Sequence, residues 1–217
     1  MESYPRFLPS GDCGLVVEFE EEIARTVNDK VLALQAYLMQ ANPRVFRELI
    51  PSYRALLVEY DPLYITYQKL EAYLHHACEQ ARNSTPQPLE LIIIPTVYGG
   101  EFGADLSFVA SYNSLTPEDV IAIHSSVDYP VYMIGFTPGF PYLGGLDSRI
   151  ACPRRATPRM KIVAGSIGIA GNQTGIYPLD SPGGWQIIGH TSLQLFSPER
   201  EPAVLLRPGN LVRFVPV

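Results

Sequence analysis

Basic side chains gather in one short segment of an otherwise acidic chain. Arg149, Arg154, Arg155, Arg159 and Lys161 place five of the 16 cationic residues within 13 positions, with no acidic residue among them. Because the net charge of the whole chain is −6, this segment predicts a local patch that attracts anions. Arginine suits bidentate binding of carboxylate or phosphate. A solvated or ion-paired surface explains the same pattern equally well.

A glycine-rich stretch follows the basic segment. Residues 165–184 contain six glycines, and donors and stacking surfaces lie among or beside them at Gln173, Thr174, Tyr177 and Trp185. Glycine lets a backbone approach a ligand closely and point its N–H groups at an anion. The pattern predicts a substrate-binding region built from these four side chains. Tight barrel turns and bulges are the alternative explanation for the glycines.

An aromatic loop stiffened by proline precedes both segments. It presents Phe136, Pro138, Phe140 and Tyr142. Proline lowers the entropy that a loop loses on docking, and aromatic residues often anchor interfaces. We therefore expect these four residues to contact a partner protein. The competing interpretation places Phe140 in the core of the domain.

Two further clusters carry weak chemical signals. His75, Cys78 and Glu79 lie on one predicted helix, but Cys78 continues its apolar stripe and no second ligand cluster exists. We therefore predict no metal site.

Ser166 lies between two glycines and is followed by Asp180 and His190. A nucleophile elbow requires a helix directly after the serine, and no helix pattern follows Ser166. The sequence contains no Gly-Lys-Ser/Thr phosphate loop.

Composition excludes several classes of protein. Of the 217 residues, 47% are apolar and 18% are charged, which is not the composition of a disordered chain. The negative net charge argues against nucleic-acid binding. No apolar run approaches the roughly 18 residues that span a bilayer, so we expect no membrane partner. No secretory signal is visible, and the three cysteines are widely spaced; both features predict a cytoplasmic protein.

Backbone chemistry divides the chain near residue 85. Fifteen of the 17 glycines lie at or after Gly99, so we expect domains at 1–85 and 86–217. The first part predicts strands at 14–19, 44–50, 53–60 and 89–94, with helices at 23–38 and from Asp61 onward. This β-α-β-β-α-β order is the ferredoxin-like pattern.

The second part predicts an all-β architecture after two short helices. The helices are expected at 105–112 and from the Thr116 N-cap onward. Short apolar runs separated by glycine and proline then predict a β-barrel or a compact sandwich. These runs lie at 131–136, 162–164, 167–170, 186–188, 192–196, 203–206 and 211–215. The fold class expected for the whole chain is α+β.

Three long segments together resemble one protein family. They are GFTPGFPYLGGL at 135–146, PRMKIVAGSIGIAG at 158–171 and QTGIYPLDSPGGWQIIG at 173–189, with shorter similarities at 95–100 and 124–126. They are similar to the family of the bacterial 5-oxoprolinase B subunit, which includes Kip-type kinase inhibitors and allophanate hydrolase subunit 1. Val163 stands where the family usually has proline, and His190 where arginine is common.

The resemblance implies a small N-terminal α/β domain followed by a cyclophilin-like β-barrel. It implies ATP-dependent opening of 5-oxoproline to L-glutamate, by a complex of this chain with the C subunit and the A subunit of 5-oxoprolinase. This chain would then be a non-autonomous enzyme subunit that need not bind ATP itself. The alternative is a regulatory protein that inhibits a sensor histidine kinase. A free-standing prolyl isomerase rests on fold analogy alone.

The implied reaction assigns roles to particular side chains. The substrate carboxylate needs a clamp, for which Arg154 or Arg159 is suited. Gln173, Thr174 and glycine N–H groups could stabilise developing negative charge. His124 is the candidate general base, because an unperturbed imidazole titrates near neutrality. A buried, hydrogen-bonded structural histidine is the alternative at this position.

Overall fold

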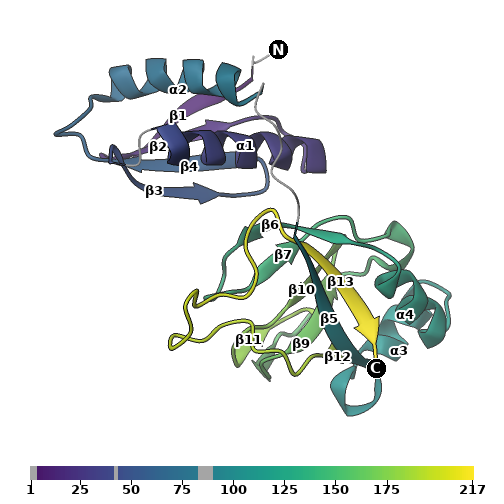
Figure 1. The fold of residues 1–217 in the computed structure, drawn as a ribbon. Helices are drawn as coiled ribbons and strands as arrows, with labels where there is room; N and C mark the ends of the chain where they lie inside the picture. The colour runs from purple at the N-terminus through teal and green to yellow at the C-terminus, as the bar shows by residue number, and fades with distance from the viewer. Residues whose placement is uncertain (1–3, 42–43, 83–89) are drawn as a thin grey trace. The chain divides into compact units, whose positions relative to one another are not determined.

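The computed structural model describes residues 4–41, 44–82 and 90–217. The chain forms two compact units, unit 1 at Met1–Pro88 and unit 2 at Leu89–Val217 (Figure 1). The expected domain boundary at residue 85 lies outside the described residues. Among the helices that are described, none combines the length and apolar character needed to cross a membrane.

Unit 1 is a four-stranded antiparallel sheet with two helices. The strand order is β1-β2-β4-β3. Helix α1 buries its predicted apolar stripe, including Val27, Val31 and Leu34, in a core shared with alternate residues of the strands. The elements are β1 (Arg6–Ser10), β2 (Gly14–Glu18), α1 (Arg25–Ala41), β3 (Phe46–Pro51), β4 (Ala55–Tyr60) and α2 (Tyr67–Ala81).

The element order of unit 1 differs from the predicted β-α-β-β-α-β order. The described order is β-β-α-β-β-α, because β1 opens the sheet and the strand expected at 89–94 lies in the other unit. Strand β1 was missed because three of its five residues are exposed and its run, which includes Pro9, lacks an apolar alternation. The expected sixth element is β5, whose Ile94 packs in the core of unit 2.

Helix α2 begins at Tyr67, five residues after Pro62, which the sequence predicts as its first helical residue. Asp61 caps a turn instead: its carboxylate accepts the Leu63 N–H at 2.9 Å and pairs with Arg47 at 2.9 Å. Leu63 lies within the helix expected from Asp61 onward, but it precedes α2 and is 93% exposed. The buried apolar stripe of this helix begins only after Tyr67, with Leu70 and Leu74.

Unit 2 is a closed seven-stranded barrel with the strand order β10-β7-β6-β13-β5-β12-β9 (Figure 1). A separate two-stranded sheet joins β11 to β8. The strands are β5 (Leu91–Tyr98), β6 (Tyr129–Ile134), β7 (Pro141–Leu143), β8 (Arg159–Ile162), β9 (Ser166–Ala170), β10 (Gln173–Ile176), β11 (Ser181–Gly183), β12 (Gln186–His190) and β13 (Leu211–Pro216). The helices are η1 (Gly100–Phe102), α3 (Leu106–Tyr112), α4 (Pro117–Ser125) and η2 (Ser148–Ile150).

The barrel is sealed by strands from the two ends of unit 2. β5 and β13 pair in parallel over six positions, while the other barrel pairs are antiparallel. The predicted barrel is thus confirmed, and it is consistent with the cyclophilin-like barrel that the family resemblance implies. The predicted start of α4 is also confirmed, since Thr116 and Asp119 form a capping box with proline at the first helical position.

Candidate functional site

Asp105 organises the basic segment against the barrel wall. It directly precedes α3 and is only 5% exposed. Its Oδ1 accepts hydrogen bonds from Nη1 of Arg155 at 3.0 Å and from Nη2 of Arg159 at 2.8 Å. Its Oδ2 accepts the backbone N–H of Ile187 in β12 at 2.7 Å. One buried carboxylate therefore fixes two arginines to the barrel.

The other basic residues of the segment differ in their partners. Arg149 pairs with Asp147 at 2.7 Å and holds the pKa of that carboxyl at about 2, chiefly through side-chain hydrogen bonds. Lys161 pairs with Asp180 at 2.7 Å. Arg154 is exposed and makes no ion pair with any described residue. Four of the five cations are thus neutralised in part by acids, and the patch keeps an excess of positive charge.

An aromatic cluster fills the barrel side next to these arginines. The Phe140 ring meets those of Tyr142, Tyr177 and Trp185 edge-on, with centroid distances of 5.0, 5.2 and 5.4 Å. A Cβ at Gly175 would lie 3.0 Å from Phe140 and 3.1 Å from Trp185. This glycine makes room for packed rings, which supports the structural explanation of the glycine-rich stretch at this position.

The hydroxyl of Tyr177 connects the aromatic cluster to the basic segment. Burial raises the pKa of Tyr177 to about 12, while the hydrogen bond from the Trp185 backbone N–H and the charges of Arg154 and Arg159 act in the opposite direction. Arg154 also lowers the pKa of Tyr142 against the larger effect of burial. Arg154 and Arg159 therefore both lie near the polar ends of the aromatic cluster.

The aromatic loop is divided between core and surface. Phe140 is 1% exposed, so the structure places it in the core, as the competing interpretation proposed. Phe136 is 62% exposed, Pro138 is exposed and Tyr142 is partly buried. Phe136 also has a backbone φ of +66°, which is uncommon for a bulky residue. Contact of these residues with a partner protein stays a prediction.

His124 and Thr174 form a hydrogen-bonded chain inside the barrel core. Both side chains are fully buried. The Thr174 hydroxyl donates to the Gly168 carbonyl at 3.0 Å, so it accepts the Nε2–H of His124 at 2.9 Å. Nδ1 of His124 then accepts the Tyr98 hydroxyl proton at 2.7 Å. Both ring nitrogens are therefore occupied.

Burial lowers the pKa of His124 to about 3. The imidazole is thus neutral at physiological pH, with its lone pair already used by Tyr98. This geometry favours the structural alternative for His124 over the role of general base. Because the Thr174 hydroxyl is occupied on both sides, it is also poorly placed to donate to a substrate. Gln173 precedes it on β10 and is partly buried.

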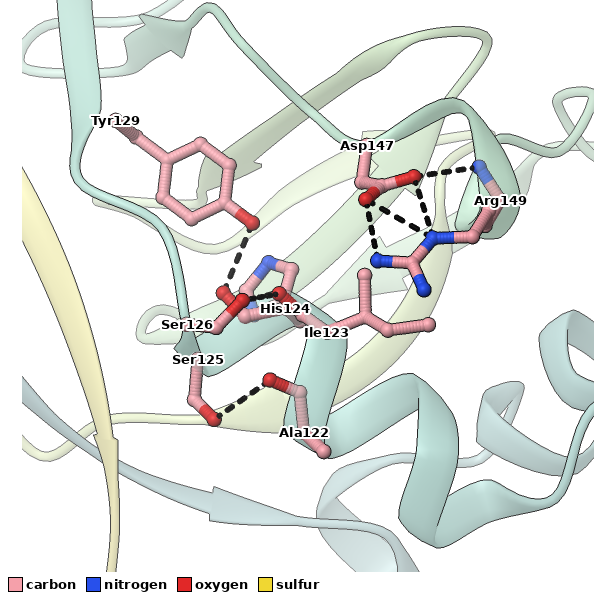
Figure 2. Close-up of polar contacts among 8 residues, drawn as sticks. All are labelled: Ala122, Ile123, His124, Ser125, Ser126, Tyr129, Asp147 and Arg149. Carbon is pink, nitrogen blue, oxygen red and sulfur yellow. Dashed lines mark hydrogen bonds and ion pairs between the residues drawn. The ribbon is translucent and has the colours of Figure 1, made fainter.

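The end of α4 supplies further bonds around His124 (Figure 2). The Tyr129 hydroxyl donates to the His124 carbonyl at 2.8 Å. The hydroxyls of Ser125 and Ser126 donate to carbonyls of the preceding helical turn. The 124–126 segment therefore terminates a helix and holds the barrel core, and its hydroxyl groups are used locally.

The serine and metal candidates do not assemble. Asp180 accepts the Ala164 N–H at 2.9 Å besides pairing with Lys161, and Nε2 of His190 bonds the Ala164 carbonyl at 2.9 Å. Within the described residues neither group bonds the Ser166 hydroxyl, and no three potential metal ligands gather. Cys78 is buried in unit 1, where burial raises the pKa of its thiol to about 11.

The two departures from the family pattern lie next to Gly165. Val163 is half exposed, and His190 stacks on Phe102 with a centroid distance of 5.1 Å. Gly165 has a φ of +85°, and a Cβ there would lie 2.7 Å from Nε2 of His190. The Cβ would also lie 2.2 Å from the Thr191 carbonyl oxygen, so the backbone itself requires glycine at position 165.

Sequence reasoning identified the arginines but missed Asp105 and the role of Arg155. Asp105 lies 50 and 54 positions before its two partners, and a single acidic residue before an apolar helix resembles an ordinary capping residue. One feature of the sequence does point to a residue such as Asp105. The basic segment contains no acidic residue, so buried arginines in it need a carboxylate from another part of the chain.

Comparisons with known proteins agree with this architecture. The family described as "Carboxyltransferase domain, subdomain C and D" matches residues 5–206. The protein of Bacillus subtilis (strain 168) that is named as the B subunit of 5-oxoprolinase is 45% identical, over 94% of this chain and 90% of that protein. The protein of the same name from Escherichia coli O157:H7 is 42% identical, over 95% and 93%.

A solved structure shows the same fold within a longer chain. The crystal structure of TTHA0988 superposes with a TM-score of 0.82 at 37% identity and covers 94% of this chain. This chain spans 40% of the length of that one. The chain thus belongs to the carboxyltransferase-domain family of subdomains C and D, together with proteins named as B subunits of 5-oxoprolinase.

Proposed function

We propose that this chain is the B subunit of an ATP-dependent 5-oxoprolinase, which opens 5-oxoproline to L-glutamate together with the A and C subunits. The observation that carries the proposal is the identity of 45% and 42% to proteins named as B subunits of 5-oxoprolinase, over at least 90% of both partners in each alignment. The carboxyltransferase-domain family also matches residues 5–206 of this chain.

The chemistry explains why the chain would work only within a complex. A lactam is a weak electrophile, and phosphorylation of its oxygen would ease the attack of water; the C–N bond of the ring then breaks to give the amine of glutamate, and the phosphoryl group leaves as inorganic phosphate. ATP supplies that phosphoryl group; the present sequence has no Gly-Lys-Ser/Thr loop, so we assign ATP binding to a companion protein of the complex. Both ring nitrogens of His124 are occupied by hydrogen bonds in the core. We therefore assign the general base to a companion protein as well.

The contribution of this chain is proposed to be substrate binding beside the barrel. Arg154 and Arg159 lie near the hydroxyl of Tyr177, and their charge suits the carboxylate of 5-oxoproline. Tyr142 is partly buried beside the same region and offers a surface for the apolar part of the substrate ring, whereas Trp185 is 5% exposed and packs against Phe140, so it can only support that surface. The exposed Phe136 and Pro138 extend from the loop at the aromatic cluster and are proposed to contact the C subunit.

Reconstitution tests this function. The chain is co-expressed with candidate A and C subunits from the same genome, the complex is purified, and ATP-dependent formation of glutamate from 5-oxoproline is measured. We expect activity only when all three proteins are present, and none from the isolated chain. Turnover by the isolated chain, or equal turnover without it, would contradict the proposal. Failure to associate, together with inhibition of a histidine kinase, would favour the regulatory alternative.

A further inference from the structure

The parallel strand β5 is apolar on both of its faces. It reads Leu-Ile-Ile-Ile-Pro-Thr-Val-Tyr from Leu91 to Tyr98, and its Ile92 and Ile94 pack in the core of unit 2. A strand with one solvated face normally alternates apolar and polar residues, whereas a near-continuous apolar run is typical of a strand that is covered on both faces. The sequence of β5 therefore indicates that its outer face is covered as well.

Strand register joins the outward residues of β5 and β13 into one continuous surface (Figure 1). Leu91 lies opposite Leu211, and Pro95 lies opposite Val215. We call this surface the β5–β13 wall; its residues are Leu91, Ile93, Pro95, Val97, Leu211, Arg213, Val215 and Val217. Five of its apolar side chains are between 36% and 76% exposed. Single exposed apolar residues are ordinary, but a contiguous apolar surface marks an interaction site.

The one charged residue of the β5–β13 wall is neutralised at its margin. Arg213 faces Ile93 across the two strands, and its Nε and Nη2 donate to the carboxylate oxygens of Asp128 at 2.6 and 2.7 Å. Asp128 directly precedes β6, the next strand of the barrel. A membrane surface or a nucleic acid is bound through unpaired cations. The wall instead fits a protein that offers an uncharged apolar face.

The family to which the chain belongs indicates which protein carries that face. Its name covers subdomains C and D of a carboxyltransferase domain, so the chain provides only part of such a domain. The relatives named as B subunits are covered over at least 90% of their length and have little room for further subdomains. Permanent interfaces resemble a hydrophobic core cut in half, so a chain with part of a domain needs an exposed apolar face for the rest.

We propose that the β5–β13 wall is the permanent docking surface for the companion protein that provides the remaining subdomains of the carboxyltransferase domain. The identity of this companion rests on the proposed function, under which it is the C subunit. Phe136 and Pro138, which are also proposed to contact the C subunit, lie in the loop between β6 and β7. The wall is therefore a second surface, and its contribution can be measured separately from that of the loop.

The first test places a charge on the wall. The affinity of the full chain for the purified C subunit is measured by calorimetry, and urea unfolding confirms that each variant is folded. We expect Val215→Glu to weaken binding by about thirtyfold or more, because a carboxylate would be buried in an apolar interface. Met160→Glu is the matched control. It adds the same charge at a residue of β8 that is 90% exposed and lies outside the wall, and it should leave the affinity unchanged.

The second test needs no substitution. Hydroxyl-radical footprinting labels the exposed side chains of the unaltered chain, alone and in the complex, and mass spectrometry locates the labels. We expect labelling of Leu91, Ile93 and Val217 to fall by about fivefold or more in the complex, as is typical of side chains buried in a well-packed interface. Labelling of Met160 should stay the same. Weak labelling of the wall in the chain alone would overturn the proposal, because the wall would then be covered already.

The remaining outcomes separate the wall from the proposed function. Undiminished labelling in the complex, or equal weakening by Met160→Glu, would overturn the wall as a docking surface. A dimer of the chain alone that is lost in Val215→Glu, with unaltered binding of the C subunit, would assign the wall to a second copy and overturn the companion.

These measurements need no turnover. A complex that protects the wall but forms no glutamate from 5-oxoproline would refute the proposed function and leave the interface standing. An active complex to which Val215→Glu binds normally would refute the wall alone. No association between the unaltered chain and the C subunit would refute both.

Discussion

The Nε2 atom of His124 lies 2.9 Å from the hydroxyl oxygen of Thr174, at the centre of a barrel whose walls exclude both side chains from water. The pair joins helix α4 to strand β10, and it extends to the Tyr98 hydroxyl on one side and to the Gly168 carbonyl on the other. A polar chain in this position stabilises one packing of the core over others, because each member needs the next.

Thr174→Val should therefore destabilise unit 2. Valine has nearly the same shape, but it leaves the His124 Nε2–H without a partner, at a cost of about 1–3 kcal/mol, and it removes the hydrogen bond to the Gly168 carbonyl. Trp185, the single tryptophan of the chain, reports unfolding of this unit in urea by its fluorescence. Ser126→Ala, at the exposed end of α4, serves as the control and should change stability by less than about 0.5 kcal/mol. An unchanged midpoint for Thr174→Val would show that the chain of hydrogen bonds contributes nothing.

The stability of unit 2 should fall as the pH is lowered below about 6.5. Burial lowers the pKa of His124 to about 3 in the folded state, whereas an unfolded histidine titrates near 6.5. The unfolded chain thus binds the extra proton between these values, and each pH unit costs about 1.4 kcal/mol. Urea titrations of Trp185 fluorescence from pH 7.5 to 5 measure the slope. His124→Asn, if it folds, should flatten the slope, and a pH-independent stability of the unaltered chain would contradict the assignment.

Phe140→Ala should act on folding rather than on assembly. The ring is buried between Tyr142, Tyr177 and Trp185, and truncating such a side chain typically costs about 3–5 kcal/mol. Denaturation of the isolated chain and affinity for the C subunit are measured on the same preparation. A weakened complex with unaltered stability would return Phe140 to the interface.

Two substitutions of Phe136 separate its backbone from its ring. Alanine and glycine both remove the exposed ring, but only alanine must keep a side chain at a φ of +66°. Phe136→Gly should therefore be more stable than Phe136→Ala by about 1 kcal/mol, the reverse of the usual order. If the ring contacts the C subunit, both variants lose the same affinity. Equal stability of the two variants would mean that position 136 leaves the left-handed region in solution.

Arg159→Ala should impair the reconstituted enzyme while leaving the fold intact. Losing a charge-assisted contact of about 1.5–3 kcal/mol should lower kcat/KM by one to two decades. Lys161→Ala is the matched control, because this residue is two positions away and pairs with the exposed Asp180. Unchanged kinetics of the Arg159→Ala complex would make Arg159 a structural partner of Asp105 only.

Elements with strong local signals could be predicted from the sequence. The stripe from Val27 to Leu38 forms α1, and the Thr116–Asp119 capping box begins α4 as expected. The run predicted at 131–136 contributes its first four residues to β6, and the run predicted at 211–215 lies within β13. These elements share a feature, since the residues that determine them are neighbours in the chain.

Elements that depend on distant partners could not be predicted. β7 and β11 have three residues each and contain proline or glycine, so they are strands only because a neighbour pairs with them. The runs at 192–196 and 203–206 were expected as strands but meet in a single bridge between Phe196 and Val204. The apolar run of β5 does not indicate whether the strand joins the sheet of unit 1 or the barrel of unit 2. The same limit applies to the site, where the arginines were visible and Asp105 was not.

The parallel pairing of β5 with β13 has a consequence for synthesis. Every strand partner within unit 1 comes from residues 6–60, so that sheet can form while later residues are still being translated. The barrel cannot close during synthesis, because β5 is translated early and its parallel partner, residues 211–216, is translated last. Until then its edges and the core-facing Ile94 stay exposed to other chains. Nascent chains stalled before residue 211 should therefore depend on chaperones for the second unit and not for the first.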